Sequence, residues 1–493
     1  MVRKKYNVII IGGGIGGLSI GSLLSKNMKV LILEKNSTFG GYCSDFKKGE
    51  FEFESAVHTI NGLYKNNPVY TILEKADALK GIRITQPKYL YRTIFPDYDI
   101  TVPQKNLDGY KRMLFSLFPK EEENITDIFD VMKSLYTETK RFHIEKSLKR
   151  SPFILKYGRR SLKYLLNRFI KDDRLKAIIA QYWLYRGLPP GKLAATTFSY
   201  IWYDYTVNGS YFPDTGMVSI IKNMISSIKK NGSDVLGDSE VFRLQAKGDK
   251  IVAVELKNGN RLGADIFISN IDVFNTFEMI ENGNNKDIKL YLDCLKKNAI
   301  SISAFKIYLG LNIDVRDLGI KDYEIFLNPR YDMDAMYEAS IKNEFEKTPY
   351  VITICSNLAN VFCKKGHSVI SIGALSEYDY WRKLSRAEYA KKKEETIDVI
   401  LKRCSKILPD VYKYIDVKIA ATPLTMERYT GNSKGSVYGW SKRSLLEEIK
   451  FMSPTTPIKN LFLSSHWTKI GGGVAGVLLS TDRVYNLLNQ KKQ

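Results

Sequence analysis

The 493-residue chain has few of the residues that build metal centres and disulfide frameworks. It has four dispersed histidines and five scattered cysteines without a CxxC pair: Cys43, Cys294, Cys355, Cys363 and Cys404. An odd set of isolated cysteines fits neither a zinc site nor a group of structural disulfides. We therefore expect a protein of a reducing compartment that holds no metal ion.

Long apolar runs are absent as well. No stretch reaches the ~18 apolar residues that a membrane-spanning helix needs, and the segment 1–6 has no apolar core of a secretion signal. The hydrophobic fraction of 44% and charged fraction of 26% are ordinary for globular proteins. At about 100–200 residues per domain, the chain predicts two to four domains. We expect a cytoplasmic protein, free or peripheral on the inner face of the membrane.

Acidic residues are outnumbered, since 75 Lys and Arg face 53 Asp and Glu, for a formal net charge of +22. Nucleic acid, an anionic membrane surface and an acidic substrate are the usual partners of such an excess. The sequence contains no zinc finger, no RNA-binding aromatic signature and no basic zipper. We therefore expect no nucleic-acid partner and retain the membrane surface as a candidate.

A glycine-rich turn near the N-terminus separates a predicted strand from a predicted helix. The apolar run 6–11 is typical of a buried parallel strand, and 18–25 has helical composition. Between them, G-x-G-x-x-G falls on Gly12, Gly14 and Gly17. These glycines permit a tight turn, a close approach of backbone to a pyrophosphate, and packing of the helix on the strand. The N-terminus of the helix then faces the phosphates, which predicts a dinucleotide site.

The residues after the second predicted strand, 28–33, distinguish FAD from NAD. Glu34 ends this strand, where its carboxylate can accept hydrogen bonds from ribose hydroxyls, and Lys35 follows it. Glu34-x5-Gly40-Gly41 resembles the extended signature of flavoproteins with two dinucleotide-binding domains. Tyr42 stands where an arginine is common in that superfamily, so no phosphate cation is carried over to it. A second glycine fingerprint is absent downstream, which argues against a separate NAD(P)H domain.

The C-terminal region contains a counterpart of this motif. A short predicted strand at 460–465 leads through 466–470 into a glycine run that contains Gly472, Gly473 and Val474. Glycines before a helix-forming segment again create an N-terminus that can face a dinucleotide. In the middle of the chain, 235–264 predicts a β-meander with a turn at 257–260.

Taken in order, these motifs and the segments 422–430 and 435–440 resemble the phytoene desaturase, carotenoid isomerase and retinol saturase family of FAD proteins. The resemblance implies an α/β fold: a Rossmann-like FAD-binding domain of the two-dinucleotide-binding-domain flavoprotein type, with an α+β substrate domain inserted discontinuously. It places the FAD domain at 1–80, 215–290 and 455–493, and the substrate domain at 81–214 and 291–454. It also implies that the backbone of Val241 meets the adenine.

A basic amphipathic segment spans 146–176, with eleven Lys and Arg and two acids. Leu162, Leu165, Leu166, Phe169 and Ile170 share one helix face. Such a helix can lie in an anionic membrane interface. It can equally be an ordinary helix whose apolar stripe packs in the core, and the sequence leaves both interpretations open.

Three side chains are candidates for proton transfer beside a flavin. His58 follows the segment that, by the resemblance, returns toward the isoalloxazine; His466 precedes the glycine run; and Tyr438 lies in the segment 435–440. A histidine exchanges protons near neutral pH, although each could instead be a structural histidine. The 31 Tyr, 23 Phe and 5 Trp could line an apolar tunnel or fill the core.

The leading hypothesis is an FAD-dependent oxidoreductase that saturates or desaturates carbon–carbon double bonds of an apolar polyene or prenyl lipid, carotenoid- or retinoid-like, by hydride transfer with the flavin. Cis–trans isomerisation of a conjugated polyene with reduced FAD is the second hypothesis. An amine-oxidase-like enzyme with a polar substrate, and a flavin-binding scaffold without catalysis, are the others. The sequence identifies neither the substrate nor the electron partner.

Overall fold

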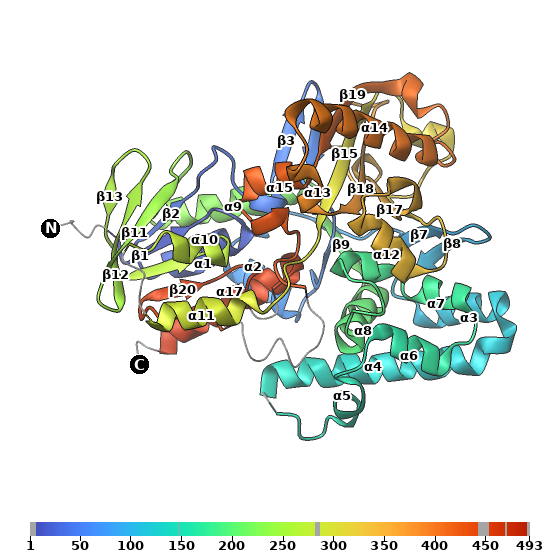
Figure 1. Ribbon diagram of the computed structural model, residues 1–493, viewed down its shortest axis with the longest axis horizontal. Helices are drawn as coiled ribbons and strands as arrows, with labels where there is room; N and C mark the ends of the chain where they lie inside the picture. Colours follow the sequence, from blue (N-terminus) through green and yellow to red (C-terminus); the bar gives the residue numbers. More distant parts are fainter. Residues whose placement is uncertain (1–5, 146, 282–285, 442–452, 469–470, 491–493) are drawn as a thin grey trace.

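The computed structural model describes residues 6–145, 147–281, 286–441, 453–468 and 471–490. Figure 1 shows a nucleotide-binding part that carries both ends of the chain, a second sheet beside it, and a lobe of helices. Lys469 and Ile470, which the sequence placed before the glycine run, lie outside the described residues.

Five parallel strands form the sheet of the nucleotide-binding part, in the order β10-β2-β1-β14-β20. They come from the start, middle and end of the chain: β1 (Val8–Ile11), β2 (Val30–Leu33), β10 (Asp234–Leu236), β14 (Ile266–Ser269) and β20 (Leu461–Leu463). The predicted strands at 6–11, 28–33 and 460–465 are confirmed, with shorter ends. Ile10 lies opposite Ile32 and Ile268, so buried apolar residues hold the register.

Each face of this sheet has its own cover. The even-numbered residues of β1 and β2 pack in one apolar cluster with the helices α1 (Ile15–Ser25), α9 (Met217–Lys230) and α17 (Gly473–Gln490). The odd-numbered residues pack against α10 (Val273–Glu278), α11 (Lys286–Lys296) and an antiparallel meander of β11 (Val241–Lys247), β12 (Lys250–Leu256) and β13 (Arg261–Leu262). This confirms the predicted meander.

A seven-stranded sheet forms the second layer, in the order β19-β15-β18-β17-β16-β7-β8. Its strands are antiparallel except for the β16–β7 pair. They are β7 (Tyr89–Ile94), β8 (Asp99–Pro103), β15 (Ser303–Leu311), β16 (Glu324–Leu327), β17 (Tyr350–Ile354), β18 (Ser368–Ser376) and β19 (Ile415–Ala421). The helices α13 (Tyr378–Arg382) and α14 (Arg386–Cys404) pack on one face, which leaves the other face for the site.

Short strands connect these layers. The hairpin of β3 (Asp45–Lys48) and β4 (Phe51–Glu54) follows the first glycine turns, and a small sheet joins β5 (Ile60–Asn61), β9 (Ser210–Pro213) and β6 (Ile84–Thr85). The helix α2 (Pro68–Lys75) packs on α17, and α15 (Pro423–Thr430) follows β19. The chain therefore passes the site several times.

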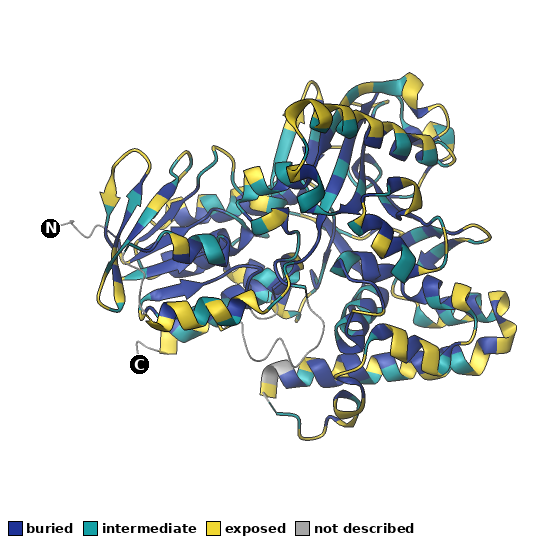
Figure 2. Cartoon of the chain, in the orientation of Figure 1, coloured by how far each residue is buried: buried dark blue, intermediate teal, exposed yellow. Residues whose placement is uncertain are grey.

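The lobe of helices has a core of its own and settles how the basic segment packs. It consists of α3 (Leu107–Leu117), α4 (Glu122–Glu145), α5 (Pro152–Tyr157), α6 (Leu162–Phe169), α7 (Asp173–Ile179), α8 (Ala195–Tyr203) and α12 (Met333–Ile341). Most of the predicted stripe is buried: α6 packs on α4 and α8, and Leu162, Leu165, Leu166 and Ile170 are at most 1% exposed, whereas Phe169 is partly buried and Ile170 lies just beyond the end of the helix. Figure 2 shows the dark buried faces turned inward. Of the two interpretations, the ordinary packed helix is therefore the observed one.

Membrane-spanning segments were tested separately. Among the helices in the described ranges, none combines the length and the apolarity required to cross a bilayer.

Candidate active site

A cavity of about 320 Å³ runs from the parallel sheet to the free face of the seven-stranded sheet. At one end it is lined by Gly12, Gly14, Glu34, Gly40, Gly41 and Gly473. At the other end it is lined by His58, Tyr185, Lys306, Thr353, Ser371 and Gly373. Residues of the first glycine turn and of the C-terminal glycine run thus share one cavity with the substrate side.

The first glycine turn leaves no room for side chains. Gly12 has φ +98°, and a Cβ there would lie 2.8 Å from Cγ2 of Ile271. A Cβ on Gly14 would lie 2.9 Å from Nδ2 of Asn270. Gly17 has a different role, because its Cβ would lie 2.1 Å from the carbonyl oxygen of Gly12. Gly12 and Gly14 therefore present bare backbone to the cavity, and Gly17 lets α1 pack on the turn.

Glu34 fixes the shape of this end of the cavity. Its Oε2 accepts a hydrogen bond from the backbone N–H of Gly13 at 2.7 Å, and its Oε1 accepts one from the N–H of Asn36 at 3.0 Å. The side chain lines the cavity while being only 9% exposed. A buried carboxylate at this position can also accept from a ribose, as the strand-end spacing predicted.

The second glycine pair lies directly on the first turn. The N–H of Gly40, at φ +109°, donates to the carbonyl of Gly13 at 2.8 Å. A Cβ on Gly41 would lie 3.4 Å from Cα of Gly14. The hydroxyl of the next residue, Tyr42, donates to the carbonyl of Ser436 at 2.9 Å, and burial raises its pKa to about 12. Tyr42 is therefore uncharged at neutral pH, and a phenol cannot replace the cation of an arginine at this position.

The C-terminal glycine run brings a second helix N-terminus to the cavity. Gly473, at φ +73°, is the first residue of α17, and a Cβ built on it would meet nothing within 4 Å. Gly473 and Val474 both line the cavity. Because α1 and α17 both begin here, two sets of free N–H groups and two positive helix ends face the same space. This cradle of bare glycines fits the pyrophosphate and ribose of FAD.

Four of the residues predicted to bind the cofactor are not part of the cavity lining. They are Gly17, Lys35, Val241 and Gly472. The Nζ atom of Lys35 donates to the carbonyl of Arg428 at 2.8 Å, and Val241 is buried in the meander core. The eight other residues predicted to bind the cofactor line the cavity: Gly12, Gly14, Glu34, Gly40, Gly41, Tyr42, Gly473 and Val474.

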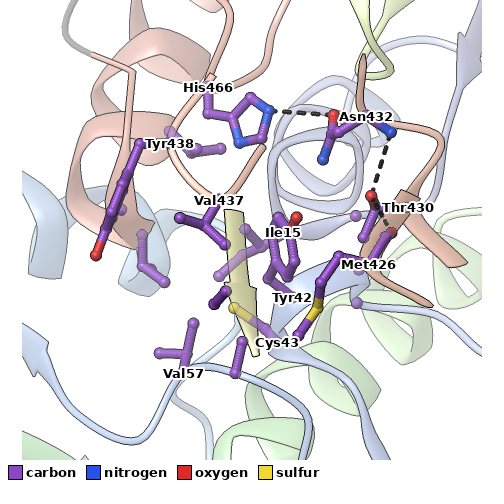
Figure 3. Close-up of a pocket in the computed structure, with 18 of the residues that line it drawn as sticks. Ile15, Tyr42, Cys43, Val57, Met426, Thr430, Asn432, Val437, Tyr438 and His466 are labelled. Atoms are coloured by element: carbon purple, nitrogen blue, oxygen red, sulfur yellow. Dashed lines mark hydrogen bonds between the residues drawn. The ribbon is translucent and has the colours of Figure 1, made fainter. Parts of the chain in front are cut away.

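The middle of the cavity is formed by residues from four segments (Figure 3). His466 and Tyr438 lie on one side, with Tyr42, Cys43 and Ile15 across from them. His466 is 9% exposed, and its Nε2 lies 3.1 Å from Oδ1 of Asn432. Burial raises the pKa of Tyr438 to about 12, so its hydroxyl stays protonated at neutral pH.

His58 belongs to a largely buried polar cluster at the end of the cavity formed by the seven-stranded sheet, where the imidazole itself is partly exposed. Its Nε2 lies 2.6 Å from Oε1 of Glu324 and 3.0 Å from the hydroxyl of Tyr185, which also donates to Glu324. Glu324 is 1% exposed, and burial raises the pKa of Tyr185 well above its ordinary value. A carboxylate in this position can orient the imidazole and balance its positive charge.

Lys306, on β15, lines the same cavity. Its ammonium group donates to the carbonyl oxygens of Ser55 at 3.2 Å and Ala56 at 3.4 Å. Burial lowers its pKa to about 8. Glu54, one residue before this pair of carbonyls, has a pKa raised to about 8 by burial, although its Oε1 accepts the N–H of Met217 at 2.7 Å.

Glu54 predicts a pH dependence of stability. The pKa of Glu54 in the folded state is about 8, far above the ordinary value of 4.5. Between these two pH values, the folded state therefore keeps the proton while the unfolded state has lost it. Its contribution is therefore complete below about pH 4.5 and is lost as the pH rises toward 8. Since one pKa unit corresponds to about 1.4 kcal/mol, the whole loss is roughly 5 kcal/mol, of which roughly 4 kcal/mol falls between pH 5 and pH 8.5.

The measurement is urea denaturation at pH 5 and pH 8.5. The wild type should lose roughly 4 kcal/mol more between these values than Glu54→Gln, which has no proton to lose. Glu74→Gln, at an exposed position on α2, is the control and should follow the wild type. Parallel pH curves for the wild type and Glu54→Gln would contradict the prediction.

Sequence reasoning missed the polar residues of the substrate end. Lys306, Thr353, Ser371 and Glu324 have no motif around them, whereas Tyr185 belongs to the aromatic cluster 182–185, which is typical of a tunnel lining or of a packed core. One signal was available for Glu324, because a carboxylate begins the otherwise apolar strand EIFL. Asn270, which directly follows β14, also lines the cavity.

The comparisons with known proteins agree with this geometry. Residues 10–76 match the NAD(P)-binding Rossmann-like domain. The chain is 26% identical to all-trans-retinol 13,14-reductase of Danio rerio over 94% of this chain and 82% of that protein. It is 25% identical to 4,4'-diapolycopene oxygenase of Methylomonas sp over 97% of both, and 25% identical to prolycopene isomerase 1 of an Oncidium hybrid cultivar over 97% of this chain and 82% of that protein.

Solved structures share the fold at lower identity. An oxidoreductase from Methanosarcina mazei has a TM-score of 0.66 at 15% identity, over 97% of this chain and all of that one. Putrescine oxidase has a TM-score of 0.66 at 12% identity, over 98% and 99%. The predicted resemblance and the Rossmann-like α/β fold are confirmed: over nearly its whole length the chain is similar to carotenoid and retinoid desaturases, reductases and isomerases.

Proposed function

We propose that this enzyme saturates or desaturates a carbon–carbon double bond of a polyene or prenyl lipid. The observation that carries the proposal is the single cavity that joins the glycine cradle to a substrate end with apolar walls and one buried His–Glu pair. When bound, FAD supplies or accepts the hydride. In this proposal, the FAD domain comprises 1–80, 215–290 and 455–493, and the substrate domain comprises 81–214 and 291–454.

His58 is the proposed proton carrier. If Nε2–H of His58 donates to Oε1 of Glu324, the Nδ1 atom is available to a substrate in the cavity. No described residue hydrogen-bonds Nδ1. In saturation, one alkene carbon receives a hydride and the other receives the proton from His58; desaturation removes both. Glu324 and Tyr185 hold the ring in place. His466 and Tyr438 are instead proposed to hold the part of the substrate that lies in the middle of the cavity.

Isomerisation is the second candidate, because a prolycopene isomerase matches over 97% of this chain. An amine-oxidase-like activity has only the shared fold behind it, at 12% identity to putrescine oxidase. Peripheral contact with an anionic membrane is a further part of the proposal. It is supported by Leu155, 70% exposed, beside Lys156 and near Arg159, and by the net charge of +22.

The test combines a spectrum with product mass. Purified protein reconstituted with FAD should be yellow, and incubation with retinol, lycopene or prolycopene should change the product mass by two hydrogens. Reduced and oxidised flavin are both supplied, so that either direction can proceed. A product of unchanged mass would favour isomerisation, and a chain that does not bind FAD would refute the proposal.

A further inference from the structure

The seven-stranded sheet brings polar side chains together on its free face. Ser371 of β18 lies opposite Thr353 of β17, which lies opposite Glu324 of β16. Opposite residues in antiparallel strands point to the same face. Lys306 of β15 lies opposite Gly373, two residues along β18 from Ser371, and therefore points to this face as well.

Three of these side chains have unused hydrogen-bond donors. Thr353 and Ser371 line the cavity at 3% and 6% exposure, and no described residue hydrogen-bonds either hydroxyl. The ammonium group of Lys306 has three N–H donors, of which two are engaged by the carbonyls of Ser55 and Ala56. Buried polar groups are normally satisfied, so these spare donors indicate a ligand.

The same face has room for that ligand. A Cβ built on Gly373 would meet nothing within 4 Å, although Gly373 lies between Lys306 and Val351 in the sheet. We call Lys306, Thr353, Ser371 and Gly373 the polar floor. Elsewhere the substrate end has apolar walls, which include Val57, Leu184, Val351, Leu375 and Val437.

We propose that the polar floor binds an oxygen-bearing end group, a hydroxyl or a carboxylate, so that the substrate is an amphiphilic polyene or prenyl lipid and not a pure hydrocarbon. Three donors around one open space recognise an acceptor oxygen, which a hydrocarbon lacks. The inference rests on the proposed function and names the substrate class of that site.

The charge of Lys306 favours the carboxylate. Its pKa of about 8 leaves it protonated at pH 7, while the neighbouring Glu54, with its pKa raised to about 8, holds a proton there, and burial raises the pKa of Cys355 to about 12. Whichever of Lys306 and Glu54 loses its proton first, the local charge falls by one near pH 8. An acid should therefore bind more weakly above pH 8, and an alcohol should change less.

The experiment compares three ligands with the same skeleton: retinol, retinoic acid and axerophthene, the hydrocarbon that has a methyl group in place of the alcohol. Dissociation constants for the FAD-loaded full chain come from quenching of tryptophan fluorescence. We expect the wild type to bind the alcohol and the acid at least about tenfold more tightly than the hydrocarbon. Thr353→Val combined with Ser371→Ala should weaken both oxygen-bearing ligands by about tenfold and leave the hydrocarbon within about twofold.

Two further variants separate charge from folding. Lys306→Met should weaken the acid more than the alcohol. Thr101→Val, on the edge strand β8 of the same sheet and outside the cavity lining, is the matched control and should change nothing. Equal binding of hydrocarbon and alcohol by the wild type would overturn the inference and leave the proposed function standing. Failure of all three ligands, and of lycopene and prolycopene as well, to bind an FAD-loaded chain would overturn both.

Discussion

Glu34→Ala is expected to weaken FAD binding by about 100-fold while the chain stays folded. The substitution removes a buried carboxylate that accepts from Gly13 at 2.7 Å and from Asn36 at 3.0 Å. The N–H of Gly13 then loses its hydrogen-bond acceptor, and the cavity loses the carboxylate that lines it near the glycine turns. Hydrogen bonds to charged groups contribute about 1.5–3 kcal/mol each, so one or two of them account for this change.

The dissociation constant of FAD is measured by flavin fluorescence on apoprotein, with circular dichroism to check the fold. Glu240→Ala is the control, because Glu240 is a partly exposed carboxylate of the same region, paired with Lys257 at 2.7 Å. It should bind FAD as the wild type does. If Glu34→Ala also bound FAD within about threefold of the wild type, this end of the cavity would not hold the ribose and pyrophosphate.

The nucleotide half of the site could be predicted because its signals are local. A strand, a glycine turn and a helix follow one another within 6–25, and the carboxylate comes at the end of the next strand. The glycines report backbone geometry directly, as Gly12 and Gly473 show with positive φ. Val241 has no such local motif, and only the resemblance placed its backbone at the adenine. It is not among the residues that line the cavity.

The substrate half could not be predicted because its parts are distant in sequence. His58 and Glu324 lie 266 positions apart, and only the pairing of β16 with β17 and of β17 with β18 places Glu324 in line with Thr353 and Ser371. Serine and threonine are common in strands and carry no signal by themselves. His58 was found because it follows a recognised segment, whereas its partner depends on sheet register.

The basic segment shows a different limit. The period of Leu162, Leu165 and Leu166 predicts a helix with one apolar face, and α6 is that helix. The pattern does not show what covers the apolar face, since a helix on a membrane surface and a helix packed on a protein core have the same spacing of apolar residues. Here the neighbours are α4 and α8, which come from separate parts of the chain.

Replacing His58 is expected to have the largest effect on turnover. General acid–base catalysis contributes about 10²- to 10⁴-fold, so His58→Gln should lower kcat by that amount with little change in KM or in FAD affinity. Glu324→Gln keeps the size of the side chain but removes its negative charge 2.6 Å from Nε2. Since Glu324 acts through the imidazole, its loss should lower kcat less, by about 10- to 100-fold.

Chemical rescue distinguishes a proton carrier from a structural histidine. His58→Ala leaves a space that opens to the cavity, so added imidazole should restore part of kcat in proportion to its concentration. His466→Ala is the matched comparison, because His466 lines the same cavity but has its Nε2 3.1 Å from Oδ1 of Asn432. It should lose binding affinity more than kcat and should gain nothing from imidazole. Rescue of His466→Ala without rescue of His58→Ala would transfer the proton step to the middle of the cavity, because each imidazole can reach only the part of the substrate that lies beside it.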